Sequence, residues 1–184
     1  MHHPVDCYPI PLFTSTAPCF ADTNKTGRSN DQFVLERIGS LNDSHNPLGL
    51  YQTYRALIDK MAPRGRLLVV GYPRFFPEPV PGNPQDSHDI CGGILVTDKV
   101  WIDRRTRDFN QVIRENALAA GAEYVDFYDA FKGHEICNAG GKPWAMNGVI
   151  PLDAQWHIPS PLSYHPNILG HQLERICLAH FRSR

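Results

Sequence analysis

One continuous apolar run, Leu67-Leu68-Val69-Val70 between Arg66 and Gly71, constrains the fold of this 184-residue chain more than any other feature. A strand that is apolar at every position buries both of its faces, as parallel strands do when helices cover the sheet on both sides. Ligands bind at the carboxyl ends of such strands. The following loop, residues 72–77, is therefore predicted to form a cleft wall that contains Tyr72. The alternative is a proline-stiffened loop that only packs its aromatic rings.

Three segments around this run have the apolar spacing of amphipathic helices. The first covers residues 47–61. The second begins at a cap, Thr97 or Asp98, and ends near residue 120, where Gly121 stops it. The third covers residues 166–181. The residues expected to face inward are Val100, Trp101, Ile113, Ala117 and Leu118 in the second helix, and Ile168, Leu169, Leu173, Ile176 and Cys177 in the third.

The order of these elements indicates the fold class. A short strand is expected at residues 124–127, residues 1–30 are predicted to be irregular, and residues 33–38 form either a helix turn or a strand. Helix, strand, helix, strand and helix in this order predict an α/β fold, a three-layer α/β/α sandwich. No repeat or boundary divides the chain, so a single domain over residues 1–184 is expected.

Composition excludes several classes of partner. Hydrophobic residues make up 42% of the chain, charged residues 20%, and the net charge is −1. This balance provides no basic surface for nucleic acid, and no apolar run is long enough for a membrane anchor. The spacing of His157, His165 and His171 matches no metal site, so neither a metal nor another cofactor is predicted.

Cysteines are spread along loop-rich sequence without forming a zinc-type pair. They are Cys7, Cys19, Cys91, Cys137 and Cys177. Widely spaced cysteines of this kind favour disulfides and an oxidising, extracellular compartment. Residues 1–6 do not have the basic start and apolar core of a signal peptide. We therefore expect the front of a secreted protein to be missing from this sequence.

The segment Ser163-Tyr164-His165-Pro166-Asn167 places a histidine where a loop meets the last predicted helix. Pro166 suits the first turn of a helix, where its missing N–H is no loss. An imidazole with an ordinary pKa of about 6.5 transfers protons at neutral pH. His165 is therefore a candidate general base, and the alternative is a histidine that caps or packs the helix start.

Several loop motifs occur together in a fixed order. They are Gly71-Tyr72-Pro73-Arg74-Phe75-Phe76-Pro77, Asn110, Tyr124-Val125-Asp126, Phe131-Lys132-Gly133-His134 with Cys137, Pro143-Trp144 with Asn147-Gly148, and the histidine segment with Gly170-His171. This ordered set resembles the back half of the SGNH (GDSL-type) lipases and esterases, in particular the secreted actinobacterial branch. The resemblance extends from about Cys7 to the C-terminus.

The resemblance implies a flavodoxin-like hydrolase that uses no metal. In this family a serine attacks the ester carbonyl, a histidine transfers the proton, and an oxyanion hole stabilises the intermediate. The histidine carries over onto His165. The cysteine pattern implies the disulfides Cys7–Cys19 and Cys91–Cys137, which leaves Cys177 free.

Two departures from the family pattern matter. Many members have an aspartate three residues before the histidine, where this chain has Leu162, so that its backbone C=O would orient the ring. A carbonyl stabilises the imidazolium less than a carboxylate does. The chain also contains no Gly-Asp-Ser nucleophile block, and it lacks the family's N-terminal strand. A hydrolase complete within this chain would need Ser40 or Ser44 as its nucleophile.

Five further loop residues have both a functional and a structural interpretation. Tyr72, Trp144 and Asn147 are predicted to bind substrate, although loop tryptophans also simply pack. His134 is expected to hold its loop rather than to act in catalysis. Arg74 is expected in a surface ion pair rather than at a leaving group.

These observations predict part of a lipase-like or esterase-like ester hydrolase that has the general base, lacks the serine and is inactive alone. The expected substrate is a small-molecule or lipid ester. An exposed sheet edge would favour association with another chain. The alternative function is a non-catalytic α/β module that binds lipid or glycan.

Overall fold

The computed structural model describes residues 18–23, 27–78, 96–138, 141–147 and 164–182. Its elements are η1 (Cys19–Ala21), α1 (Asn30–Asn42), α2 (Leu50–Ile58), β1 (Leu68–Val70), α3 (Val96–Ala120), β2 (Glu123–Val125) and α4 (Ile168–Arg182). β1 and β2 form a parallel sheet with the register Leu68 to Glu123, Val69 to Tyr124 and Val70 to Val125.

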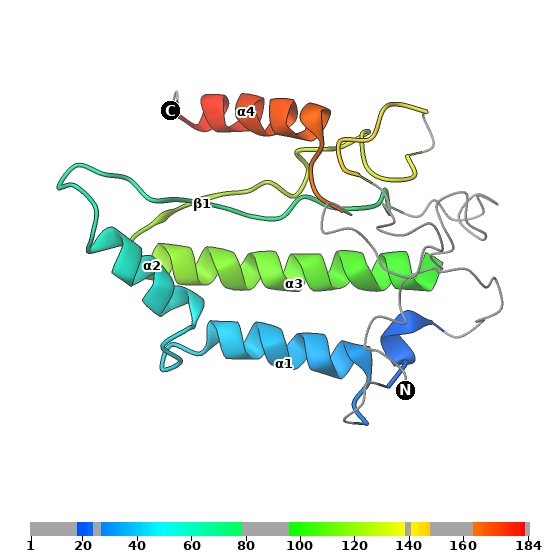
Figure 1. The fold of residues 1–184 in the computed structure, drawn as a ribbon, viewed down its shortest axis with the longest axis horizontal. Coiled ribbons are helices and arrows are strands. Elements are labelled where there is room, and N and C mark those ends of the chain that lie inside the picture. The colour runs from blue at the N-terminus through cyan, green and yellow to red at the C-terminus, as the bar shows by residue number, and fades with distance from the viewer. Residues whose placement is uncertain (1–17, 24–26, 79–95, 139–140, 148–163, 183–184) are drawn as a thin grey trace, which may run out of the picture.

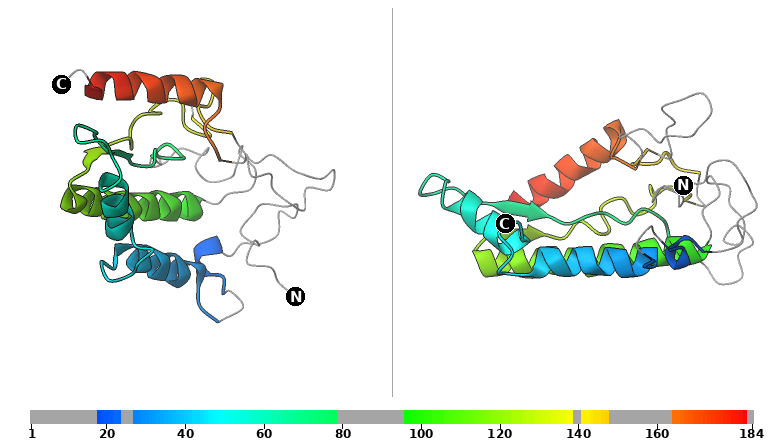
Figure 2. Two further views of the ribbon diagram at one scale, coloured as in Figure 1. Left: turned by 60° about the vertical axis from the view of Figure 1, so that its left-hand side comes forward. Right: turned by 60° about the horizontal axis from the view of Figure 1, so that its bottom comes forward.

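The elements form three layers (Figure 1). The sheet lies between α4 on one side and α3 on the other. Figure 2 shows α1 beside α3 in the same layer. The predicted α/β fold is confirmed, and the expected strands and helices are present. α2, α4 and both strands are shorter than predicted, whereas α3 begins slightly earlier than predicted. The ambiguous residues 33–38 belong to α1, which begins at a capping box made by Ser29 and Gln32.

Each face of the sheet is buried by a different helix layer. Val69 packs with Ile113 and Ala117 of α3 in one apolar cluster. Val125 belongs to a second cluster, against which Leu68 packs together with residues of α4. Successive side chains of a strand point to opposite faces, so two covered faces favour apolar residues along the run at residues 67–70. Val70, at the end of the run, is nevertheless 37% exposed.

The buried face of α3 is partly polar, which the apolar pattern did not predict. Ile113 and Ala117 are buried as expected, whereas Val100 and Leu118 are exposed, so the prediction for these two was wrong. The buried stripe instead includes Thr106, Asn110 and Asn116, all of which form hydrogen bonds. Because their polar groups are satisfied, these side chains can occupy positions that a hydrophobicity pattern assigns to apolar residues.

The ends of α3 are defined by different interactions. Gly121, with φ +86°, follows the helix in the left-handed conformation that glycine adopts readily, as predicted. At the other end, neither Thr97 nor Asp98 is a cap, because α3 already begins at Val96. Asp98 is buried and accepts a hydrogen bond from the Phe20 N–H at 3.4 Å. Burial is the main cause that raises the pKa of this carboxyl group.

α4 begins two residues later than predicted and buries a different face. Asn167 caps it, since its side-chain oxygen accepts from the Gly170 N–H at 3.1 Å. Ile168 and Ile176 are exposed, which corrects the predicted inner face. The apolar residues of α4 that pack against the core are Leu173, Cys177, Leu178 and Phe181.

Two of the expected disulfide cysteines can be placed. Cys19 and Cys137 each take part in a disulfide, and Cys177 has a free thiol. Cys7 and Cys91 lie outside the described residues. The pairings Cys7–Cys19 and Cys91–Cys137 therefore stay predictions.

Neither a membrane-spanning helix nor a metal-binding cluster occurs in the part of the chain that the structure describes. No helix there is both long enough and apolar enough to cross a bilayer. No group of three or more histidine, cysteine or acidic side chains there is arranged to hold a metal ion.

Candidate functional site

The carboxyl ends of β1 and β2 point toward the end of the molecule where α4 begins (Figure 1). Two loop segments meet at this end. The Asn147 N–H donates to the His165 carbonyl at 2.9 Å, and the Asn167 N–H donates to the Ala145 carbonyl at 3.0 Å. These bonds flank an antiparallel bridge between Met146 and Pro166. The backbone of the histidine segment is therefore fixed to the loop at residues 141–147.

His165 projects from this fixed backbone with an exposed side chain. The preceding Tyr164 has φ +60°, an uncommon conformation for a residue with a side chain. Its ring packs edge-on against Phe75 at 6.3 Å between centroids. The turn at Tyr164 thus directs His165 outward while anchoring the segment to the core. Leu162, the predicted orienting residue, lies outside the described residues.

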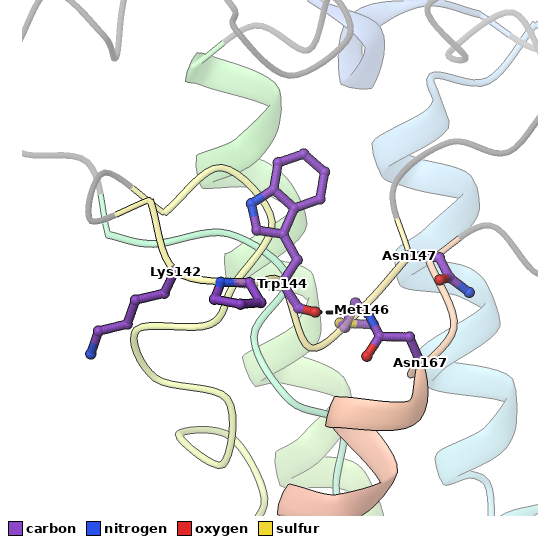
Figure 3. Close-up of a pocket in the computed structure, with 6 residues that line it drawn as sticks. Lys142, Trp144, Met146, Asn147 and Asn167 are labelled. Atoms are coloured by element: carbon purple, nitrogen blue, oxygen red, sulfur yellow. Dashed lines mark hydrogen bonds between the residues drawn. The ribbon is translucent and has the colours of Figure 1, made fainter.

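An open pocket of about 420 Å³ lies beside the start of α4 (Figure 3). Its lining residues are Lys142, Pro143, Trp144, Met146, Asn147 and Asn167. Two of the three predicted substrate-binding residues, Trp144 and Asn147, come together here. Tyr72 and His165 do not line this pocket. Asn167 was not singled out as a binding residue by the sequence, because asparagine after proline also has the simpler role of a helix cap.

Tyr72 lies directly after β1, with its side chain about half exposed. Its ring packs against Phe109 of α3 at 5.5 Å between centroids. Its backbone N–H and C=O both bond to the buried Asn110 side chain. Tyr72 is thus held at the carboxyl edge of the sheet, away from the Trp144 pocket.

Arg74 is buried rather than on the surface. Its side chain is only 7% exposed, and it forms an ion pair with Asp129 through Nη2. Its Nε lies 3.5 Å from Oε1 of Glu135, which is also buried. Its backbone N–H donates to the Tyr128 carbonyl at 2.9 Å. The predicted ion pair exists, but the Arg74 guanidinium is buried, and its carboxylate partners lie in the loops after β2.

A second polar cluster lies next to Arg74. The Tyr128 hydroxyl donates to Asp103 of α3, and the Arg107 guanidinium lies 4.3 Å from the centre of the Tyr128 ring. Burial and the neighbouring Asp103 carboxylate raise the pKa of the Tyr128 phenol above its ordinary value. Tyr128 therefore stays protonated and donates this hydrogen bond throughout the physiological range.

His134 holds its loop, as predicted. Its Nδ1 lies 2.8 Å from the Pro143 carbonyl. A carbonyl only accepts, so Nδ1 carries the proton in this contact. The His134 carbonyl in turn accepts from the Ala145 N–H at 2.7 Å. These contacts give His134 a positioning role beneath the Trp144 pocket.

Ser40 and Ser44 do not come near His165. Ser40 lies in the last turn of α1 and Ser44 just after that helix. Figure 1 shows that α1 and the start of α4 lie on opposite sides of the molecule, with α3 and the sheet between them. The Ser40 hydroxyl instead accepts from Asn46 Nδ2 at 3.1 Å. Neither serine forms a dyad with His165 in this structure.

Comparison with known sequences identifies relatives among bacterial lipases. No protein-family model matches the chain. Lipase 1 from Streptomyces coelicolor is 32% identical over 155 residues, which are 82% of this chain and 51% of that lipase. A lipase from Streptomyces rimosus is 30% identical over 142 residues, which are 75% of this chain and 49% of that lipase. The chain thus spans about half the length of the curated relatives it matches.

Solved structures agree with these relatives. An extracellular lipase from Streptomyces rimosus matches with a TM-score of 0.57 and 26% identity, over 80% of this chain and 55% of that one. Phospholipase A1 from Streptomyces albidoflavus shares the fold, with a TM-score of 0.58 and 24% identity over 83% of this chain and 58% of that one. Sequence and structure together identify the chain as a partial SGNH lipase-like protein.

Proposed function

We propose that this chain is the histidine-bearing part of a secreted ester hydrolase that acts on lipid esters. The observation that carries the proposal is the 32% identity to Lipase 1 of Streptomyces coelicolor over 82% of the chain. Two further observations support export from the cell. The Streptomyces rimosus lipase of similar structure is described as extracellular. In this chain Cys19 and Cys137 each take part in a disulfide, and disulfides persist in oxidising compartments.

His165 is the proposed general base. Its backbone is held by Asn147, while its imidazole is exposed beyond the carboxyl end of the sheet. The ring can therefore reorient about its side-chain bonds without moving the loop. The Leu162 carbonyl is proposed to orient the ring, and Tyr72, Trp144 and Asn147 are proposed to contact the substrate.

The serine nucleophile is proposed to come from a polypeptide segment outside this sequence. The chain contains no Gly-Asp-Ser. Ser40 and Ser44 belong to α1 and the turn after it, on the opposite side of the molecule from the start of α4. A triad enzyme without its nucleophile retains only the residual catalysis that comes from binding and oxyanion stabilisation. The isolated chain is therefore expected to be inactive.

The open edge of β1 is the proposed place where that segment joins. On either side of β1, the Gly71 N–H donates to the Val125 carbonyl, and the Leu67 carbonyl accepts from the Glu123 N–H. The backbone groups of the odd-numbered residues therefore point toward β2. The backbone groups of Leu68 and Val70 consequently point to the other side, where no strand among the described residues pairs with them. Such an edge is a template for a further strand.

Labelling with a fluorescent fluorophosphonate tests the proposal. The purified chain is labelled alone and after mixing with the half of Streptomyces coelicolor Lipase 1 that it does not match. We expect no label on the chain alone, and serine labelling with ester hydrolysis in the mixture that is lost in His165→Ala. A labelled serine within the chain alone would instead identify a complete hydrolase.

The second candidate function is a non-catalytic module that binds lipid or glycan. The pocket that combines Lys142 with Trp144 favours it, because an indole and an ammonium group suit the binding of an amphipathic ligand. A soluble complex of the two polypeptides that binds ligand without any labelled serine would support this function.

A further inference from the structure

We infer that Lys142, Trp144 and Ile168 form a docking surface for lipid aggregates that carry anionic headgroups. We call these three residues the docking surface. The inference deepens the proposed function, on which it rests for the choice of lipid. It concerns how the chain approaches an aggregated substrate, not how the ester bond is broken.

The docking surface contains two exposed large apolar residues whose backbones are held close together. Ile168 is 80% exposed although it is the first residue of α4, and Trp144 is 37% exposed. The two positions are joined by Asn167, whose Nδ2 donates to the Trp144 carbonyl at 2.7 Å. An indole has an apolar body and a polar N–H, which suits it to the boundary between headgroups and acyl chains. Exposed apolar residues that adjoin in this way indicate an interaction site.

Hydrogen bonds hold the loop beneath these side chains rigidly. Each carbonyl from Lys142 to Ala145 accepts one. The donors are Asn138 Nδ2 to Lys142, His134 Nδ1 to Pro143, Asn167 Nδ2 to Trp144, and the Asn167 N–H to Ala145. Because the backbone is already ordered, presenting Trp144 to a lipid surface costs little additional conformational entropy.

The charge of this region complements an anionic surface. Among the described residues that line the pocket, Lys142 is the only charged one, and none of them carries a carboxylate. In Figure 3 the Lys142 side chain extends outward from the loop that also carries Trp144. A lysine beside apolar side chains that enter a membrane interface is attracted by anionic headgroups, and this attraction weakens with salt. The docking surface therefore combines insertion with electrostatic attraction.

A matched control exists on the opposite side of the molecule. Leu48 lies between α1 and α2 and is also 80% exposed. Figure 1 shows that this loop and the start of α4 lie far apart, on opposite sides of α3. Replacing Leu48 or Ile168 by serine removes the same kind of exposed apolar side chain. Only Ile168→Ser alters the docking surface.

Vesicle co-sedimentation tests the inference. The chain is mixed with vesicles of phosphatidylcholine alone or of equimolar phosphatidylcholine and phosphatidylglycerol, at low and high salt. We expect binding to the anionic vesicles that weakens about tenfold in Ile168→Ser or Trp144→Ala and about fivefold in Lys142→Gln. Leu48→Ser is expected to bind like the unmodified chain.

Several outcomes would overturn the inference. They are equal losses for Leu48→Ser and Ile168→Ser, no loss for Trp144→Ala, and equal binding to neutral and anionic vesicles. Because vesicle binding requires neither the serine nor His165, His165→Ala should bind normally. A failure to bind vesicles would leave the hydrolase proposal intact, and absent serine labelling would leave the docking surface intact.

Discussion

The carboxamide of Asn110 binds both backbone groups of Tyr72. Asn110 Oδ1 accepts from the Tyr72 N–H at 2.7 Å, and Asn110 Nδ2 donates to the Tyr72 carbonyl at 2.8 Å. Backbone groups of successive residues point to alternate sides of a strand, so the N–H and C=O of Tyr72 lie on the side of β1 that faces away from β2. A side chain from α3 thus substitutes for a neighbouring strand at the point where β1 becomes the loop that carries Tyr72.

Asn110→Ala should destabilise the chain because it leaves buried backbone groups of Tyr72 unpaired. We expect a decrease of about 2–4 kcal/mol in the free energy of unfolding, since two hydrogen bonds are lost. Urea titration followed by circular dichroism measures this change. The adjacent Gln111 is exposed on the same helix, so Gln111→Ala serves as the control. Equal effects of the two substitutions would contradict the role of Asn110.

Gly170→Ala should separate α4 from the loop below it. A Cβ atom at this position would lie 2.2 Å from the Ala145 carbonyl oxygen, too close for any side chain. We expect a loss of about 1–3 kcal/mol in the free energy of unfolding, as in other overpacked sites. Gly39→Ala is the matched control, because Gly39 lies in α1 with no atom within 4 Å of such a Cβ. Gly39→Ala should instead stabilise the helix by about 0.5–1 kcal/mol, and thermal melts compare the two.

Arg74→Met should be strongly destabilising. It leaves the buried Glu135 carboxylate without its cationic neighbour, and breaking a buried ion pair costs about 3–5 kcal/mol. The control is Arg66→Met, which breaks the exposed pair with Glu123, whose nitrogen–oxygen distance is 2.5 Å. Surface pairs contribute little, so the midpoint of urea unfolding should fall in Arg74→Met and change little in Arg66→Met. Similar midpoints for the two variants would argue against a buried role for Arg74.

Asp31 should make stability depend on pH. Its carboxylate bonds to Arg105 and Trp101 of α3, and the Arg105 hydrogen bond is the main cause that lowers its pKa. A group whose pKa is lower in the folded state stabilises the protein above the unfolded value, about 3.9 for aspartate. This stabilisation is lost as the pH falls through the folded-state pKa.

The variant Asp31→Asn isolates this effect. At pH 7 we expect it to lower the free energy of unfolding by about 1.5–3 kcal/mol, because hydrogen bonds to a charged acceptor are lost. The difference from the unmodified chain should shrink progressively as the pH falls below about 4. Urea titrations across this range measure the difference, and a difference that is constant with pH would exclude the carboxylate as its source.

Local sequence patterns were sufficient to predict several elements of the fold. The apolar run at residues 67–70 predicted a strand covered on both faces, because alternation between two covered faces favours apolar residues along the run. Spacing predicted α2, α3 and α4, and Gly121 predicted the end of α3, since few other residues adopt its φ of +86°. The motif order around His165 predicted the resemblance to lipases that the comparisons support.

Local patterns could not predict which side chains are buried and what they contact, because both depend on tertiary contacts. Arg74 is buried because Asp129 and Glu135 reach it from the loops after β2, more than 50 residues along the chain. Ile168 is exposed because α4 meets the core through Leu173 and Cys177 instead. Hydrophobicity describes the preference of a residue for burial, whereas burial itself depends on partners that are distant in sequence. Contacts between distant parts of the chain also bring Trp144 beside the start of α4. Ser40 and Ser44, in α1 and just after it, lie on the opposite side of the molecule from that helix start.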